Sequence, residues 1–372
     1  MSRQEAAIHP HWFIFRESLK KIWFLPIVSI VGILWMTLPP ILQYAQRHPE
    51  VFPAQAVPHG EINYILISEY ALRPGTAALA FGMALLLFRF LNDKKMVSVH
   101  YSLGVTRTGL VFPRLLAGAL MLLAGLIPPI FVLAQVNAHY FGATPALRIS
   151  AVYLCCAALM VGLLTLGITA AMFSSTGISG EAAFFSLTLL LAPSLYSLPL
   201  LMLGDGYSFA RELTARLSNY NPLLFRADKI PPVFVPHDFS EYEEMLNPKW
   251  QSPDFAALIP WALAALGSCA LAVWLFHRRP AERVGFPGKN RVMNFVCTAL
   301  LGLFPFGTIV MFYPDYAPVS SFFVGLFAYA PVYLALEFIL LRDPRLVKRG
   351  LPKFAGHVAL ALGLWLWIQT WR

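Results

Sequence analysis

The chain has 372 residues, of which 58% are hydrophobic and only 13% are charged. Soluble domains contain about 25% charged residues, so this composition excludes an ordinary soluble enzyme or binding module. The net charge of +9 does not indicate a nucleic-acid-binding protein, because the basic residues cluster beside long apolar blocks. Blocks of about 20 apolar residues predict a single all-α polytopic membrane domain, without the short alternating strands of an outer-membrane barrel.

The first 21 residues predict a cytoplasmic amphipathic helix that lies on the membrane surface. One stripe of this helix is apolar, and the charged residues Arg16, Glu17, Lys20 and Lys21 lie opposite; the stripe consists of Trp12, Phe15, Leu19, Ile22 and Trp23. The alternative is that this segment is only a charged flank of the first span. The apolar run that follows has no cleavage site of small residues, so we expect it to remain as a membrane anchor.

About nine spans follow along the chain. They are predicted at 22–45, 74–91, 111–135, 149–173, 182–203, 254–276, 292–312, 320–341 and 354–371. We expect a six-span core over 22–276 with a net acidic extracytoplasmic segment at 204–253. A cytoplasmic loop at 277–291 then leads to a three-span extension over 292–372. Prolines within the first and third spans predict bends in those helices.

The distribution of charge predicts which side of the membrane each loop occupies. With the N-terminus in the cytoplasm, the inside segments hold 19 of the 28 Lys and Arg residues. Cytoplasmic loops carry an excess of Lys and Arg, so this topology is the favoured one.

The stretch 92–107, NDKKMVSVHYSLGVTR, is a polar island between two apolar runs. Asp93 is a candidate N-cap, and Gly104 is a candidate helix stop. Between them an apolar face recurs at helical spacing, formed by Met96, Val99, His100 and Leu103. We therefore expect a two-turn amphipathic helix, which either docks in a groove of a partner or lies on lipid as an ordinary basic loop.

The sequence contains no signature of a catalytic site. It lacks the HExxH and Gly-x-Ser-x-Gly motifs, and it lacks a P-loop, so we expect no ATP hydrolysis by this chain. No Cys or His residues have metal-ligand spacing, and we expect no metal or cofactor. Glu337 is the one carboxylate predicted within a span, and its proximity to Arg342 favours local pairing over a transport role.

Two segments resemble motifs of ABC-2-type permease subunits of Gram-positive bacteria. Residues 100–107, HYSLGVTR, are similar to the His-Ser-Leu-Pro-x-x-Arg sequence that follows the second span in that family. Tyr101 is inserted here, and Gly104 stands where proline is usual. Residues 279–285, RPAERVG, are similar to the family's Arg-x-x-Glu-x-x-Gly, through Arg279, Glu282 and Gly285. The resemblance covers about residues 1–290.

The resemblance implies the permease of an exporter in the bacterial cell membrane, driven by a separate cytoplasmic ABC ATPase. Residues 92–107 would be the coupling helix, in which Met96, Val99 and Leu103 are apolar anchors. The basic residues Lys94, Lys95 and Arg107 would meet acidic groups of the partner or phosphates of membrane lipids. We expect a homodimer, or a heterodimer with a related permease. Nucleic acid is not expected as a partner.

Two other classes of function remain open. A secondary transporter would show inverted repeats and broken polar helices at mid-membrane, but 22–173 and 182–341 share no convincing repeat. A membrane-embedded lipid-modifying enzyme would need a buried cluster of His, Asp or Glu, which the sequence does not predict.

Overall fold

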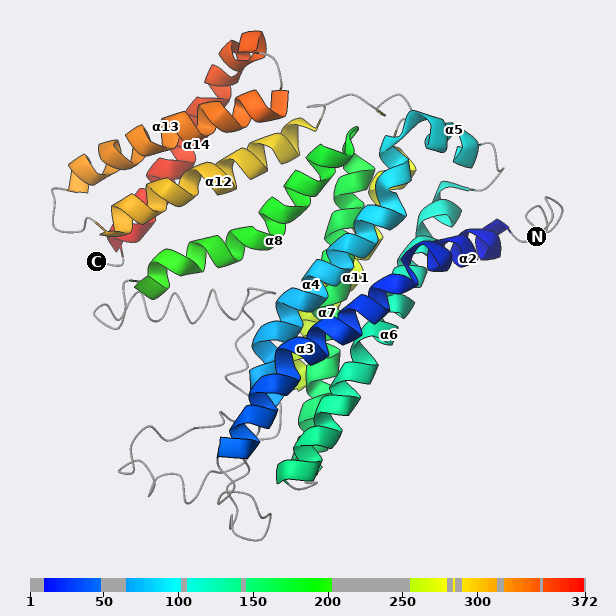
Figure 1. The fold of residues 1–372 in the computed structure, drawn as a ribbon. Coiled ribbons are helices and arrows are strands. Elements are labelled where there is room, and N and C mark those ends of the chain that lie inside the picture. Colours follow the sequence, from blue (N-terminus) through cyan, green and yellow to red (C-terminus); the bar gives the residue numbers. More distant parts are fainter. Residues whose placement is uncertain are drawn as a thin grey trace, which may run out of the picture. The chain divides into compact units, whose positions relative to one another are not determined.

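The computed structural model describes residues 10–47, 65–101, 106–141, 145–202, 255–279, 284, 290–312, 318–341 and 344–370. These residues form helices and no strand (Figure 1). In chain order the helices are α2 (Pro10–Ile22), α3 (Phe24–Arg47), α4 (Ile65–Phe88), the 3₁₀ helix η2 (Arg89–Asn92), α5 (Lys94–Tyr101), α6 (Arg107–Phe141), α7 (Pro145–Ser175), α8 (Ser179–Met202), η5 (Phe255–Leu258), α11 (Ile259–Arg278), α12 (Arg291–Phe312), α13 (Pro318–Leu341) and α14 (Pro344–Thr370).

Seven helical segments among the described residues are long and apolar enough to cross a membrane. They are His11–Pro39, Gly75–Asn92, Arg107–Val136, Ala151–Ser175, Ile259–Arg278, Arg291–Val310 and Val319–Phe338. The prediction of an all-helical chain that crosses the membrane several times is therefore confirmed.

The two remaining predicted spans, at 182–203 and 354–371, also lie on helices. The apolar stretch Ser179–Ala192 of α8 is shorter than a full span. Helix α14 is not among the seven, and its first half carries several basic side chains. The count of nine spans and the cytoplasmic N-terminus therefore remain predictions, and the predicted extracytoplasmic segment 204–253 lies outside the described residues.

The chain divides into two compact units. Unit 1 consists of Met1–Arg89, Ser98–Ala171 and Arg226–Arg278, and unit 2 of Phe90–Val97, Met172–Phe225 and Arg279–Arg372. Helix α8, which the sequence placed in the six-span core, belongs to unit 2 because it packs against α12.

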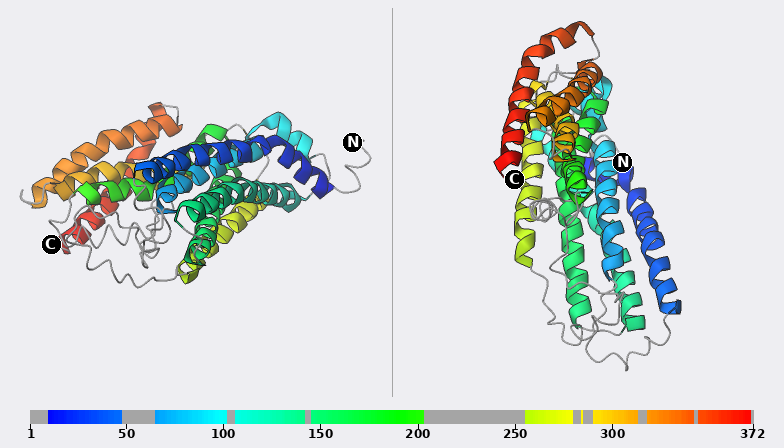
Figure 2. Two further views of the ribbon diagram at one scale, coloured as in Figure 1. Left: turned by 60° about the horizontal axis from the view of Figure 1, so that its bottom comes forward. Right: turned by 90° about the vertical axis from the view of Figure 1, so that its left-hand side faces the viewer.

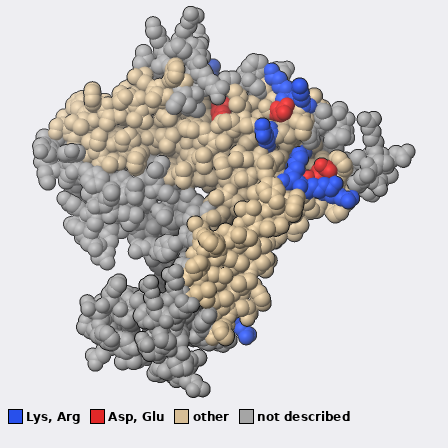
Figure 3. Space-filling view, viewed as in Figure 1, with Lys and Arg blue, Asp and Glu red and all other residues tan. Residues whose placement is uncertain are grey.

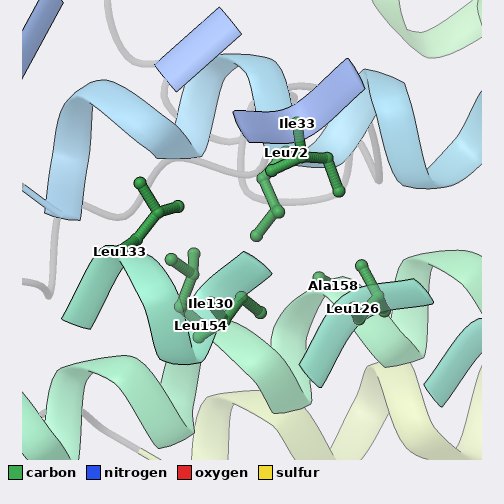
Figure 4. Close-up of a cluster of buried hydrophobic side chains, with 7 residues drawn as sticks. All are labelled: Ile33, Leu72, Leu126, Ile130, Leu133, Leu154 and Ala158. Carbon is green, nitrogen blue, oxygen red and sulfur yellow. The ribbon is translucent and has the colours of Figure 1, made fainter. Parts of the chain in front are cut away.

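The core of unit 1 is formed where α3, α4, α6 and α7 meet. Seven buried aliphatic side chains fill this region (Figure 4): Ile33, Leu72, Leu126, Ile130, Leu133, Leu154 and Ala158. Helices α3 and α6 run side by side, as Figure 2 shows, with α3 packed along α6. A Cβ at Gly125 would lie 3.4 Å from the Pro26 Cα, so α3 and α6 are in close van der Waals contact at this point.

Helix α2 ends at Ile22 because of a proline four residues later. Pro26 has no N–H to donate to the Ile22 carbonyl, and its ring crowds that carbonyl. Helix α3 starts afresh at Phe24 after a one-residue turn at Trp23.

The inward face of α2 differs from the predicted stripe. Ile14, Ser18 and Ile22 are buried against the rest of unit 1, whereas Trp12 and Trp23 are 58% and 60% exposed. The stripe predicted to lie on the membrane surface is thus not the packing face, although Ile22 belongs to both, and its contact with the membrane stays a prediction. Ser18 tolerates burial because its hydroxyl donates to the Ile14 carbonyl at 2.7 Å.

In unit 2, α12, α13 and α14 pack around an aromatic core. Phe306, Val310, Tyr329, Tyr333 and Ala361 are all 1% exposed or less. A Cβ on Gly302 would collide with the ring of Tyr329, so glycine is needed where α12 meets α13.

Candidate partner-docking site

Helix α5 is positioned by the aspartate that precedes it. Asp93 Oδ1 accepts hydrogen bonds from the backbone N–H groups of Lys95, at 2.9 Å, and of Met96, at 3.4 Å. The Asp93 carbonyl accepts the first helical bond from Val97 at 2.9 Å. This is the geometry of an N-cap, in which a side-chain oxygen satisfies amides that have no partner within the helix. The predicted N-cap is confirmed.

One side of α5 is exposed and another faces the protein. Lys94, Lys95 and Met96 are exposed, with Met96 at 39%, whereas Val97 is only 7% exposed. Met96 is thus available as the predicted apolar anchor, and Val97 is a packing residue that the predicted face did not include. The backbone of Val99 and His100 is helical, but their side chains and all of Leu103 lie outside the described residues.

Arg279 connects the base of α5 to the end of α7. Its Nη1 donates to the carbonyl of Phe173 at 2.7 Å, and its Nη2 donates to Asn92 Oδ1 at 2.8 Å. The Phe173 carbonyl lies in the last turn of α7, where carbonyls have no helical partner and the helix dipole favours a cation. Asn92 directly precedes the Asp93 cap, so the guanidinium holds the chain at the point where α5 begins.

Arg279 is only 2% exposed, so these contacts are shielded from water. Burial strengthens charge-assisted hydrogen bonds and makes their loss costly. Arg279, the first residue of the motif segment 279–285, therefore contacts the first residue of the stretch 92–107 within unit 2. The other two predicted motif residues, Glu282 and Gly285, lie outside the described residues, while Val284 between them is buried.

Arg107 makes a similar contact within unit 1. Its Nη1 donates to the His277 carbonyl, in the last turn of α11, at 2.9 Å. Thr106 caps α6, because its Oγ1 accepts a hydrogen bond from the Gly109 N–H at 3.2 Å. The described hydrogen bond of Arg107 thus stabilises a helix end within the protein, and the predicted contact of this residue with a partner or a lipid stays a prediction.

A second polar cluster lies among α12, α13 and α14. Glu337 is 1% exposed, and its Oε1 lies 3.4 Å from Lys353 Nζ. His357 is fully buried; its Nδ1 is hydrogen-bonded to the Tyr329 hydroxyl, and its Nε2 lies 3.5 Å from Thr298 Oγ1. Glu337 is thus paired with Lys353 of α14, sixteen residues away, and its expected local pairing with Arg342 stays a prediction because Arg342 lies outside the described residues.

Sequence reasoning missed Asn92, Phe173 and Lys353 at these sites. Asn92 stood next to the predicted cap, but a phenylalanine that contributes only its carbonyl leaves no sequence signal.

Among the described residues, no group of three or more His, Cys, Asp or Glu side chains could hold a metal ion. Comparison with protein-family models, curated proteins and solved structures found no significant match to this chain.

Proposed function

We propose that this chain is the permease subunit of an ATP-binding cassette exporter in a bacterial cell membrane. A separate cytoplasmic ATPase would dock on α5 and supply the energy of ATP hydrolysis. The observation that supports this proposal most is the pair of Arg279 hydrogen bonds, which join the base of an exposed helix to the end of α7.

This connection suits the transmission of movement. A push on α5 acts on Asn92 at its base, and Arg279 passes the displacement to the last turn of α7, a helix of 31 residues. Each hydrogen bond to a charged group contributes about 1.5–3 kcal/mol, enough to make the contact persistent. Helix α6 contains Pro113, Pro128 and Pro129, which supply points where a span bends.

The exposed side of α5 defines the chemistry expected of the partner. Met96 would insert into an apolar groove, and Lys94 and Lys95 would face acidic side chains at its rim. The permease would act as a homodimer, or as a heterodimer with a related permease. Export is the direction that the family resemblance implies.

Purification of the full chain from its native membranes, with any co-purifying ABC ATPase identified by mass spectrometry, tests this proposal. Met96→Asp places a charge on the exposed side, and we expect it to abolish retention of the ATPase. Met96→Leu is the matched control, because it keeps an apolar side chain at the same exposed position of the helix. Retention of the ATPase by Met96→Asp, or equal loss in Met96→Asp and Met96→Leu, would overturn α5 as the docking helix.

A secondary transporter is the second candidate, favoured by the buried Glu337–Lys353 pair. In this case a proton gradient would drive transport through the pair, and vesicles that contain the chain but no ATPase would take up the transported compound. The substitution Glu337→Gln should then abolish this uptake. Vesicles of the unaltered protein that show no gradient-driven uptake would exclude this candidate.

A further inference from the structure

The end of α11 in unit 1 presents an arginine that lies over an exposed tryptophan. Arg278 is the last residue of this helix and is exposed, and its Cζ lies 4.4 Å from the centre of the Trp274 ring. Trp274 is itself 48% exposed. Because Trp274 precedes Arg278 by about one turn, the guanidinium is directed back along the helix toward its apolar part. Both members of this cation–π pair therefore lie at the surface.

The end of α11 belongs to a charged end of unit 1. Arg107, at the start of α6, donates from Nη1 to the His277 carbonyl at 2.9 Å. Two residues further along α6, the Gly109 carbonyl lies 3.4 Å from Nδ1 of His11 on α2. The end of α11 and the starts of α6 and α2 therefore lie together. Figure 3 shows basic side chains over α2, whereas the visible surface along α3 and α6 is almost wholly uncharged. The candidate span Ile259–Arg278 thus ends where charge replaces apolar surface, which is the level of the lipid headgroups.

The Arg278 side chain is able to bind an anion in this position. Contact with an aromatic face leaves N–H groups of a guanidinium able to donate. Among the described residues, none accepts a hydrogen bond from Arg278 or forms an ion pair with it. Arg107 adds a second positive charge and covers the His277 carbonyl, which at the C-terminus of a helix would repel an anion. A phosphate group suits this arrangement, because its oxygens accept two parallel hydrogen bonds from one guanidinium.

We propose that Arg278 and Trp274 bind an anionic phospholipid, with the phosphate at the guanidinium. This proposal is independent of the exporter function. An anionic headgroup fits better than a zwitterionic one, because the ammonium group of the latter would be repelled by Arg278 and Arg107. The indole ring holds the guanidinium at the membrane–water interface, where tryptophan is enriched in membrane proteins.

The exposed face of α11 matches the acyl chains of such a lipid. Leu271, Gly267 and Leu263 precede Trp274 at helical spacing, and all three are exposed. Leu271 is 44% exposed and Leu263 is 65% exposed. A phosphate at the end of the helix would therefore have its acyl chains along a continuous apolar face. This continuity favours a lipid over a soluble anion.

Reconstitution of the full chain into phosphatidylcholine vesicles that contain brominated phosphatidylglycerol tests the site. Each chain is measured beside its Trp274→Phe version, so that the difference in tryptophan quenching reports on the ring at the site alone. Comparison with brominated phosphatidylcholine gives the relative association constant of the anionic lipid. A basic residue near the membrane surface favours anionic lipid about fivefold, so Arg278→Gln should lower this constant about fivefold. Arg278→Lys, which keeps the charge, should largely preserve it.

Arg148→Gln is the matched control, because Arg148 is exposed near the start of α7. Close to it the ring of Tyr153 lies 5.4 Å from the ring of Phe255, just before α11 begins. Arg148 is therefore near the start of α11, about 30 Å from the end that carries Arg278. We expect this variant to keep the relative association constant of the unaltered chain.

Three results would overturn the proposal. The first is equal preference of the unaltered chain for both lipids, or an equal loss in the Arg278→Gln and Arg148→Gln variants. The second is quenching of Trp274 by neither lipid, since a second copy of the chain or another protein would then cover α11. The third is displacement of the brominated lipid by millimolar glycerol phosphate, since the site would then recognise a free phosphate.

Discussion

Replacement of Arg279 by methionine should loosen α5 without unfolding the protein. The substitution removes two charge-assisted hydrogen bonds and leaves the Phe173 carbonyl and Asn92 Oδ1 without their donor. Bonds of this kind contribute about 1.5–3 kcal/mol each. Removal of a buried guanidinium also relieves its desolvation cost, which offsets part of that loss. We therefore expect a net loss of about 2 kcal/mol in the free energy of local opening, or about thirtyfold in the opening equilibrium.

Hydrogen–deuterium exchange of the full chain in lipid nanodiscs measures this effect. The amides of Lys95, Met96 and Val97 should exchange about thirtyfold faster in Arg279→Met, and exchange in the core of α6 should not change. Arg278→Met is the matched control, because Arg278 is exposed and its guanidinium lies 4.4 Å from the centre of the Trp274 ring. Unchanged exchange in α5, or equal acceleration in both variants, would refute the role of Arg279.

Three further substitutions test the helix cap, the aromatic core and the buried ion pair. Asp93→Ala should cost about 1 kcal/mol of α5 stability through loss of the cap, seen as faster exchange of its first amides, whereas Asp93→Ser should restore most of it. Gly302→Ala should lower the thermal midpoint of unfolding, since the added methyl group overpacks α12 against α13 at about 1–3 kcal/mol. Gly307→Ala should leave the thermal midpoint unchanged, because its Cβ would lie at an ordinary contact distance of 3.8 Å from the Leu364 side chain. Glu337→Met should destabilise unit 2 by leaving Lys353 without its partner, and the added Lys353→Met should recover stability; a double variant less stable than the single one would contradict this.

The helices were predictable from the sequence because hydropathy is a local property. Each of the nine predicted spans overlaps a helix among the described residues, and the cap at Asp93 was evident from residue type and position alone. The packing face of α2 was not predictable in this way. Lipid and protein interior are both apolar, so exposed Trp12 and Trp23 and buried Ile14 and Ile22 carry the same hydrophobic signal.

The Arg279 contacts also could not be derived from the sequence. The residues they join are separated by 106 and 187 positions, and one acceptor is a backbone carbonyl. A basic loop residue after a span is expected in any cytoplasmic loop. Arg279 is a buried helix-capping residue only because the ends of α7 and η2 lie close together in the folded chain. The sequence does not show this proximity, so it cannot distinguish Arg279 from a solvated arginine.

The polar cluster of the last three helices favours a structural role for Glu337 over proton transport. A proton route needs polar groups through the full hydrocarbon thickness of about 30 Å. From Glu337 to Tyr329 the described cluster extends along α13 by eight residues, or about 12 Å. Beyond Tyr329, contacts between aromatic rings continue the core, with Phe306 and Trp365 against Phe322. The ion pair and the His357 hydrogen bonds therefore hold α12, α13 and α14 together at one end, which weighs against the secondary transporter as the second candidate function.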